Sequence, residues 1–303
     1  MSQKNSVYRS PLFYVGDKYK LLKEIKQYFP KNIDTFVEPF VGGGSVFLNV
    51  NAKRYLLSDI DKNVISIHKY LLSQNQNEEA FFQSLKRIAK KYNLSRSYFE
   101  DVVPSSLKKQ WEKTYYAHFN REGYQQLRED YNKSSKKDPL LLYVLLIYGF
   151  NRMLRFNQKG EFNIPVGNVD LNQNVIRSLK DYFNLTKDRE IDFCSQDFKD
   201  FLKDLRLSKK DFVYVDPPYL ITGSEYNKLW SEERDVELMH ILDELNRKNI
   251  KFAMSNVTSY QNKQNKKLIA WAKDYKTKKI DSNYINYHDN RKKDIKEVLI
   301  TNY

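Results

Sequence analysis

The sequence predicts an α/β fold in which one sheet is interrupted by a basic, mostly helical insertion. Short runs rich in β-branched and aromatic residues alternate with helix-like segments at both ends of the chain, the pattern of βαβ units. That alternation stops between Gln74 and Arg189, where the sequence is charged and helical in period. We therefore expect a sheet domain built from residues 1–73 and 190–303, and an insertion formed by residues 74–189.

The charge of the chain favours a polyanionic partner. Lysine and arginine outnumber the acids by enough to give the 303 residues a formal net charge of +14, with an isoelectric point near 9.4. Such an excess is typical of proteins that bind nucleic acid. An AT-rich genome, which enriches lysine, asparagine and tyrosine, would give a similar composition.

Cysteine and histidine usage argues against disulfides and metal sites. The single cysteine, Cys194, excludes a disulfide framework and a cysteine-based zinc site, and the four histidines are scattered, so we expect no metal. The longest apolar run, residues 140–150, is too short to cross a membrane, and residues 1–10 hold no signal-peptide core. These features predict a soluble, cytoplasmic protein.

The most informative stretch is Asp216-Pro217-Pro218-Tyr219. It follows residues 211–215, which have the composition of a buried strand, and its two prolines end that strand because proline lacks an N–H and has a fixed φ. Asp216 and Tyr219 are therefore expected at the carboxyl edge of the sheet, where open α/β folds bind their ligands.

These groups suit methyl transfer to an exocyclic amine of a base. The lone pair of such an amine is delocalised into the ring, and two acceptors that hold its two N–H bonds would free it for attack. The Asp216 carboxylate and the Pro217 carbonyl can be these acceptors, and Tyr219 can stack on a base flipped out of a duplex. A strand followed by a Pro-Pro turn with a surface tyrosine is the plainer interpretation.

Two upstream motifs predict a cofactor that contains a nucleoside. Three consecutive glycines, Gly42 to Gly44, follow a short strand and let the backbone approach a ligand closely, unless they form only a tight turn. The next strand leads into Asp59, Ile60 and Asp61, and an acid in this place suits the two ribose hydroxyls. We assign that role to Asp59, while Asp61 can cap the following helix.

Two weaker signals lie elsewhere in the sheet domain. Gly16 precedes a helix-like segment and can bring backbone amides and Lys18 close to a carboxylate or phosphate, although a plain turn also explains it. Asp197 and Phe198 follow a further strand and suit a cofactor adenine, with an acceptor for its amine and a ring to pack on. Asp197 can also cap a helix over residues 198–206.

A basic hairpin is expected within the insertion. Gln158-Lys159-Gly160 is a turn signal between two short alternating segments of residues 150–168. A two-stranded ribbon fits the major groove of DNA, where arginine can hold guanine with two hydrogen bonds; a solvated basic hairpin is the alternative. A second basic tip, residues 289–293, suits phosphate contacts or is a solubilising turn.

Taken in order, these motifs resemble a known family over nearly the whole chain. The chain is similar to the Dam-type (D12 class) DNA adenine-N6 methyltransferases of the α group, in which the glycine motif comes first and the target-recognition domain precedes the Asp-Pro-Pro-Tyr motif. The segments that carry the resemblance are VEPFVGGG at residues 37–44, SDID at 58–61, FNRMLRFNQKGEFNIPVG at 150–167, DF at 197–198, DPPY at 216–219, SN at 255–256 and EVLITNY at 297–303.

The resemblance implies a Rossmann-like, seven-stranded methyltransferase sheet, S-adenosylmethionine as cofactor, a flipped adenine in double-stranded DNA as substrate, and target recognition by residues 74–189. It implies catalytic roles for Asp216, Pro217 and Tyr219. The residues it implies for the cofactor are Tyr14, Lys18, Phe40, Gly42, Gly43, Gly44, Asp59, Ile60, Asp197, Phe198 and Asp216. The residues expected to contact DNA are Asn151, Arg152, Met153, Arg155, Asn157, Lys159, Arg291 and Lys292.

The chain departs from the family pattern at its N-terminal motif. That motif usually has the form K-W-x-G-G-K, whereas residues 13–18 lack the leading lysine, which GATC-specific members use for the first guanine, and the second glycine. Arg155 matches the hairpin arginine that reads a guanine at the far end of the site, and Met153 replaces a usual leucine. The expected target is a short palindrome containing AT, with GATC, CATG and other sites open.

Other functions remain open on the sequence. Cytosine-N4 methylation uses similar chemistry, although its motif usually begins with serine, and an RNA adenine methyltransferase can also carry the Asp-Pro-Pro-Tyr motif. A DNA-binding protein without activity would not need the glycine turn, Asp59 and Asp216 together, and a nuclease would need a metal-carboxylate site. A methyltransferase of this kind fits a restriction-modification or a solitary methylation system, and we expect a monomer.

Overall fold

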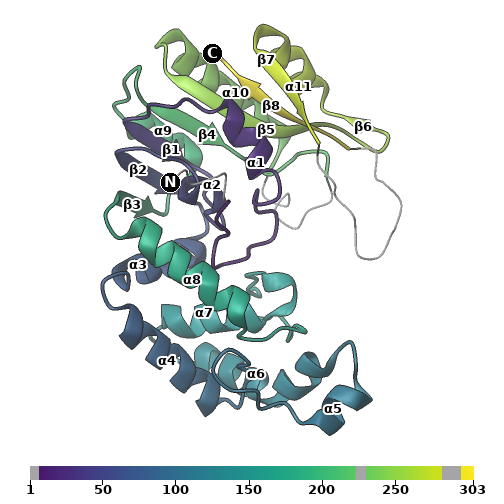
Figure 1. Ribbon diagram of the computed structural model, residues 1–303. Helices are drawn as coiled ribbons and strands as arrows, with labels where there is room; N and C mark the ends of the chain where they lie inside the picture. Colours follow the sequence, from purple (N-terminus) through teal and green to yellow (C-terminus); the bar gives the residue numbers. More distant parts are fainter. Residues whose placement is uncertain (1–6, 223–229, 282–294) are drawn as a thin grey trace.

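A central, mostly parallel sheet organises the chain. The computed structural model describes residues 7–222, 230–281 and 295–303. The strands follow the order β3-β2-β1-β4-β5-β8-β7 (Figure 1). The first five are parallel, β8 runs antiparallel to them between β5 and β7, and β7 again runs in their direction, as the α/β expectation requires. The strands are β1 (Thr35–Glu38), β2 (Arg54–Ser58), β3 (Glu190–Cys194), β4 (Phe212–Val215), β5 (Lys251–Tyr260), β7 (Lys276–Ile280) and β8 (Ile295–Thr301), and the short β6 (Lys263–Gln264) pairs with the end of β5.

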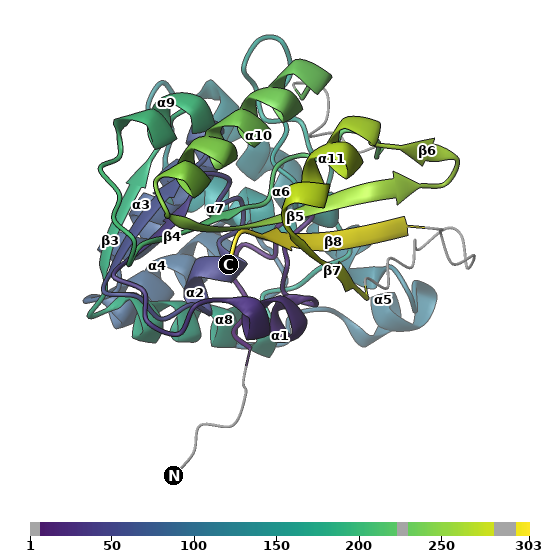
Figure 2. The ribbon, with the colours of Figure 1, turned by 90° about the horizontal axis from the view of Figure 1, so that it is seen from above.

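The two faces of the sheet are both covered, so its central strands are apolar on both sides. Strand β4 is buried at every position, which is typical of a strand with helices above and below it. Tyr214 belongs to one core cluster, while Val213 and Val215 belong to the other. Helices α9 (Phe198–Asp204), α10 (Glu232–Arg247) and α11 (Lys266–Trp271) supply residues to the second cluster and cover that face (Figure 2).

The opposite face is covered by shorter elements from the first part of the chain. The helix-like segment expected after Gly16 is brief in the structure. Strand β5 reaches as far as Tyr260, because its far end pairs with β6 and β8. The elements on this side are α1 (Leu22–Ile25), the 3₁₀ turn η1 (Lys26–Tyr28), α2 (Ser45–Leu48) and α3 (Lys62–Ser73); a further 3₁₀ turn, η4 (Ala272–Asp274), follows α11 on the other side.

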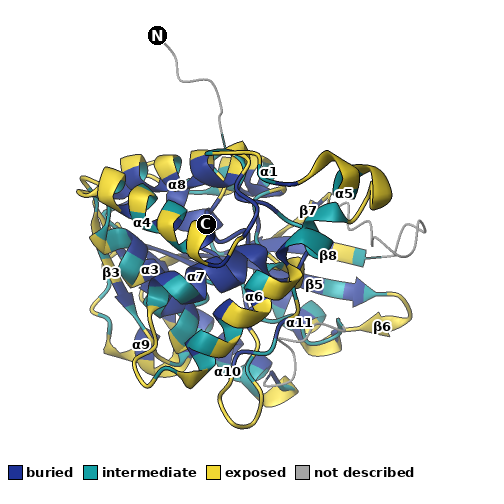
Figure 3. Cartoon of the chain, turned by 90° about the horizontal axis from the view of Figure 1, so that it is seen from below, coloured by how far each residue is buried: buried dark blue, intermediate teal, exposed yellow. Residues whose placement is uncertain are grey.

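The helical insertion packs against the sheet domain through two helices, of which α7 is the more apolar and α8 is the other. Helix α7 begins at Pro139, with the Asp138 carboxylate accepting a hydrogen bond from the Leu140 N–H, and is buried nearly all round (Figure 3). It packs on both α3 and α6, so the insertion and the sheet share one core. The helices of the insertion are α4 (Glu78–Lys91), α5 (Ser105–Gln110), α6 (Tyr115–Lys133), α7 (Pro139–Tyr148), the 3₁₀ turn η2 (Phe150–Arg152) and α8 (Gln173–Thr186).

The hairpin of residues 150–168 is less regular than the expected two-stranded ribbon. Its two arms pair at isolated bridges, Gly149 with Val166 and Phe156 with Phe162, and a turn over residues 157–160 joins them. A continuous ladder does not form because Asn151 and Arg152 have positive φ and Pro165 has no N–H to donate. The segment is therefore a looped hairpin held by a few cross-links.

Gly123 on α6 gives a test of the packing between α4 and α6. A Cβ atom at this position would lie 1.7 Å from the carbonyl oxygen of Tyr92. Alanine favours a helix over glycine by about 1 kcal/mol, but this clash should outweigh that gain, so we expect Gly123→Ala to lower the free energy of unfolding by about 2 kcal/mol or more. Urea denaturation measures this, with Glu122→Ala at the neighbouring exposed position as the matched control. An unfolding midpoint for Gly123→Ala equal to the wild-type value would contradict the close contact.

Candidate active site

Three of the motifs meet at the carboxyl edge of the sheet. Asp216 follows β4, the glycine turn follows β1, and Asp59 follows β2. Strand β1 lies between β2 and β4 and is parallel to both, so the three strand ends are neighbours. The fold thereby brings together the residues that the sequence assigned to catalysis and to the cofactor.

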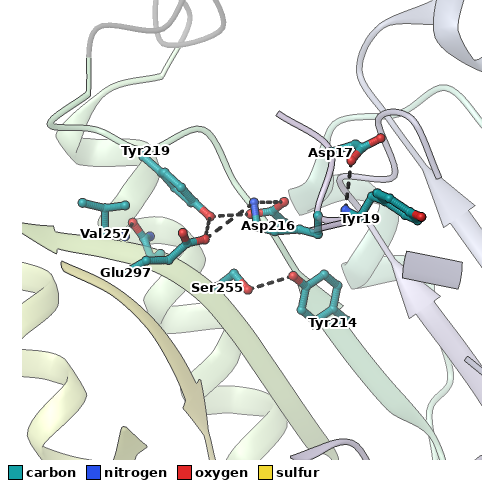
Figure 4. A network of polar contacts seen from close by, with 10 residues as sticks. Asp17, Tyr19, Tyr214, Asp216, Tyr219, Ser255, Val257 and Glu297 are labelled. Carbon is teal, nitrogen blue, oxygen red and sulfur yellow. Dashed lines mark hydrogen bonds and ion pairs between the residues drawn. The ribbon is translucent and has the colours of Figure 1, made fainter. Parts of the chain in front are cut away.

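Both carboxylate oxygens of Asp216 have partners. Lys18 Nζ lies 2.7 Å from Oδ2, and the Tyr219 hydroxyl donates a hydrogen bond of 2.9 Å to Oδ1 (Figure 4). Lys18 is buried, with 4% of its side chain exposed, and its ammonium lies 5.0 Å from the centre of the Tyr219 ring. The lysine expected at the cofactor thus contacts the proposed catalytic carboxylate directly.

Glu297 completes this network and was missed by sequence reasoning. It lies on β8 with 1% exposure, its Oε1 is 3.0 Å from the Tyr219 hydroxyl and 3.9 Å from Lys18 Nζ. The single phenolic proton of Tyr219 is therefore shared between two carboxylates (Figure 4). The Lys18 ammonium lies close to both carboxylates. The signal was present in the sequence, since Glu297 is an acid at the start of an otherwise apolar run, residues 298–300.

Glu38 is a second buried acid that the sequence analysis did not single out. It ends β1, is 2% exposed, and its Oε2 has no hydrogen-bond partner. Burial, together with the nearby charges of Asp216 and Asp59, raises the pKa of Glu38 well above its usual range. A buried carboxyl with a vacant acceptor beside a glycine turn is the kind of group that a ligand can satisfy.

The glycine turn is shaped by contact with the N-terminal loop. Gly42 and Gly44 have φ values of +45° and +78°, which favour glycine. A Cβ at Gly43 would lie 2.8 Å from Cβ of Tyr14, so no larger residue fits beneath that loop. Tyr14 is buried here against the turn, and its expected contact with the cofactor stays a prediction.

Asp59 is tied to the glycine turn by its own carboxylate. Oδ2 accepts a hydrogen bond of 2.9 Å from the Gly42 N–H, and Oδ1 accepts one of 2.9 Å from the Asp61 N–H. Burial raises the pKa of Asp59 to about 6 despite these bonds. The side chain of the neighbouring Ile60 is 62% exposed, which is unusual for an isoleucine. Asp61 caps α3, as the sequence predicted.

A group of aromatic rings closes the other side of this edge. The Phe40 ring lies 5.3 Å from that of Phe198 and 5.6 Å from that of Trp230. Asp197 caps α9 and forms an ion pair with Arg234, whose guanidinium carbon is 4.9 Å from the centre of the Phe198 ring. Sequence reasoning missed Arg234, a base in the otherwise acidic first turn of α10.

The residues expected to contact DNA do not form one cluster. Arg155 is exposed and donates from Nε to Asn163 Oδ1 at 2.8 Å, whereas Arg152 turns away from the hairpin and packs on the ring of Phe13. Of the others, Asn151, Asn157 and Lys159 are exposed and Met153 is partly buried; Arg291, Lys292 and the rest of the basic tip lie outside the described residues, as do Gly223 and Ser224 of the loop after Tyr219.

Across residues 7–222, 230–281 and 295–303, no group of three or more histidine, cysteine or acidic side chains is arranged to hold a metal ion. None of the helices within those ranges has the length and apolar character needed to span a membrane.

Comparisons with known proteins match most of the chain to DNA methyltransferases. A family model described as D12 class N6 adenine-specific DNA methyltransferase matches residues 14–286. The chain is 35% identical to the type II methyltransferase M.FokI of Planomicrobium okeanokoites and 33% identical to the modification methylase StsI of Streptococcus sanguinis, with 99% and 97% of this chain covered. It is 30% identical to a DNA adenine methylase of Escherichia coli, over 82% of this chain and 80% of that protein. The chain spans only 43% of the length of M.FokI and of StsI.

The raised pKa of Asp59 predicts a dependence of stability on pH. Because its pKa is about 6 in the folded protein and 3.8 as the ordinary value, the folded state binds more protons between these values, and Asp59 destabilises the fold as the pH rises from about 4 to 6. We expect the free energy of unfolding of Asp59→Asn, relative to wild type, to increase by about 2–3 kcal/mol between pH 4 and pH 7. Urea denaturation across this range measures it, and a difference that does not change with pH would contradict the burial of a charged Asp59.

Proposed function

This chain belongs to the D12 class N6 adenine-specific DNA methyltransferases, and from that premise we propose that it transfers a methyl group from S-adenosylmethionine to N6 of an adenine in a short site of double-stranded DNA. The observation that carries the proposal is the Asp216 carboxylate, held by Lys18 and Tyr219 at the strand end next to the glycine turn. Residues 74–189 would serve as the target-recognition domain.

The residues around the glycine turn fit the amino-acid part of this cofactor. Three of their polar atoms are buried without a hydrogen-bond partner, namely Asp17 Oδ2, Glu38 Oε2 and Ser45 Oγ. Such atoms are costly unless something satisfies them, and the ammonium group of a methionine tail would do so. Gly43 and Gly44 leave the backbone bare at the same place.

The nucleoside part of the cofactor fits the neighbouring groups. Asp59 would accept hydrogen bonds from the ribose hydroxyls, and its raised pKa is what an acid awaiting such donors would show. The exposed Ile60 and the ring of Phe40 would pack on the adenine. Phe198, which is 2% exposed, would support Phe40 from behind, and Asp197 would contact the adenine amine while it remains paired with Arg234.

The catalytic step follows from what Asp216, Pro217 and Tyr219 can hold. The cofactor, when bound, supplies a methyl group on a positively charged sulfur. Asp216 and the Pro217 carbonyl would accept the two N–H bonds of the flipped adenine and direct the nitrogen lone pair, so that much of the rate comes from positioning. Asp216 need not be a strong base, because the nitrogen becomes acidic once methylated and then gives up its proton.

The occupied state of Asp216 has a consequence for substrate binding. Lys18 and Tyr219 use the oxygens that the adenine amine needs. Binding of the base would therefore displace at least the Tyr219 hydroxyl, which keeps a second acceptor in Glu297. Once released, the Tyr219 ring would be free to stack on the base.

Sequence specificity is assigned to the looped hairpin. Arg155 is exposed on it, and Asn163 orients its guanidinium, which suits two hydrogen bonds to a guanine. Asn151, Met153, Asn157 and Lys159 would contribute from the same segment, with Arg291 and Lys292 contacting phosphates. The exact target, whether GATC, CATG or another short site, is left to experiment, as are a restriction-modification or solitary role and a monomeric state.

Methylation sequencing tests the proposal most directly. The chain is expressed in a host without DNA methylation, and its genomic DNA is sequenced for modified bases. We expect N6-methyladenine in one short motif. N4-methylcytosine instead would identify a cytosine methyltransferase, and unmodified DNA from cells whose soluble protein binds S-adenosylmethionine would indicate an RNA substrate.

Substitution of the catalytic carboxylate separates chemistry from cofactor binding. We expect Asp216→Ala to retain measurable binding of S-adenosylhomocysteine by calorimetry but to lose turnover by a factor of about 1,000 or more, since positioning and charge stabilisation at the amine are both lost. Tritium transfer to duplex DNA measures the rate. Turnover at the wild-type rate would rule out Asp216 as the group that holds the amine.

A further inference from the structure

Two guanidinium groups from distant parts of the chain share one aromatic ring. The Arg9 guanidinium carbon lies 4.5 Å from the centre of the Phe13 ring, and that of Arg152 lies 4.0 Å from the same centre. Arg9 also lies 5.2 Å from the ring centre of Tyr19. Phe13 thus brings together two cations, one from the N-terminal loop and one from the start of the hairpin. We call Arg9, Phe13 and Arg152 the arginine pair site.

The backbone at this site is strained at three positions. Phe13, Asn151 and Arg152 have φ values of 48°, 53° and 50°, although none of them is glycine. Left-handed backbone is unusual for a bulky residue such as phenylalanine, and it persists only where surrounding contacts enforce it. Backbone strain of this kind is more common at functional sites than elsewhere. Because it occurs in both segments that meet at Phe13, this site is a candidate for binding a ligand.

The charges of the arginine pair site are not neutralised. Within the described part of the chain, neither guanidinium makes an ion pair, and Arg152 Nε is buried without a hydrogen-bond partner. Burial and the neighbouring charge of Arg9 lower the pKa of Arg152 to about 10. Burial raises the pKa of the nearby Asp17 carboxyl, although the positive charge of Arg9 acts in the opposite direction. Asp17 Oδ2 is buried without a hydrogen-bond partner. Arg9 is exposed to solvent while Arg152 is partly buried, and neither guanidinium has an ion-paired carboxylate among the described residues.

The position of the site limits what that anion can be. The loop that carries Arg9 and Phe13 continues to Tyr14 at the glycine turn and to Lys18 at Asp216. The Tyr143 hydroxyl of α7 donates to the Pro11 carbonyl at 3.1 Å, which fixes this loop beside the start of the hairpin. The arginine pair site therefore lies between the catalytic carboxylate and the segment assigned to target recognition.

We propose that Arg9 and Arg152 together bind one backbone phosphate of the DNA, close to the target nucleotide; this rests on the proposed function. A phosphate carries a full charge and several acceptor oxygens, which matches two uncompensated guanidiniums better than the neutral edge of a base does. Stacking on Phe13 limits the orientations open to the Arg152 guanidinium, 4.0 Å from the ring centre. The phosphate contact would position the duplex without reading its sequence.

Salt dependence of DNA binding tests this assignment. Arg9→Gln, Arg152→Gln and the double variant are compared with wild type by fluorescence anisotropy, on a duplex with the methylated motif and on an unrelated duplex, at several KCl concentrations. Each single substitution should weaken binding to both duplexes by a similar factor and reduce the slope of log Kobs against log[KCl] by about 1, because one fewer counterion is released. Loss on the motif alone with an unchanged slope would identify base readout and overturn the proposal.

Two further variants exclude a purely structural role. Arg152→Gly removes the guanidinium and also relieves the left-handed strain, so it should leave the melting temperature unchanged or raised while the salt slope falls. A lowered melting temperature with an unchanged slope would mean that Arg152 only packs on Phe13. Arg206→Gln is the matched control, since Arg206 is exposed in the connection that enters β4 at the opposite edge of the sheet, and its slope should equal that of wild type.

The proposed function and this site can fail separately. If the wild-type chain binds duplex DNA but neither binds S-adenosylhomocysteine nor methylates DNA, the proposed function is wrong while the slopes still decide the phosphate contact. If the wild type methylates DNA and the arginine variants keep its slope, the phosphate contact alone is wrong. If the wild-type chain binds no duplex at any salt concentration, both are wrong.

Discussion

The contact between Lys18 and Asp216 is the interaction on which the site depends. It joins the N-terminal loop to the end of β4, and through the Tyr219 hydroxyl it extends to Glu297 on β8. Removing one partner of a buried ion pair leaves an uncompensated charge and costs about 3–5 kcal/mol, so the loop, the central strand and the antiparallel edge are held in one arrangement. The orientation of the Asp216 carboxylate, to which we assign the catalytic role, is thus fixed before any substrate arrives.

The same edge of the sheet collects more buried acid than its own cations neutralise. The carboxylates of Asp216 and Glu297 lie 2.7 Å and 3.9 Å from the Lys18 ammonium. Glu38 and Asp59 lie at the neighbouring strand ends, and burial raises the pKa of both. A protein with a large positive net charge has here a locally acidic interior. The acidic interior suits a cationic cofactor and the basic surface suits a polyanion, because each ligand then meets the opposite charge.

Local motifs were predicted well, and long-range partners were not. The strands that end at Glu38, Ser58 and Val215, and the cap at Asp61, follow from apolar runs and turn residues alone. Glu297 and Arg234 were missed because they act through residues 78 and 37 positions away, and no periodicity records such a pairing. The hairpin was predicted to be a more regular ribbon than it is, for a related reason. Arg152 has a left-handed backbone and contacts Phe13, and the alternation of residues within the hairpin cannot reveal such a distant contact.

The shared core of α7 and α3 bears on how target specificity can change. Because α7 is apolar nearly all round and packs on a helix that follows β2, detaching the insertion would expose a large apolar surface. Exchange of the whole insertion between relatives would have to preserve that internal surface, whereas residues 150–168 lie at its margin and are held by few cross-links. Under the role proposed for this looped hairpin, substitutions within residues 150–168 would change specificity with less disturbance of the core than recombination of the helical body.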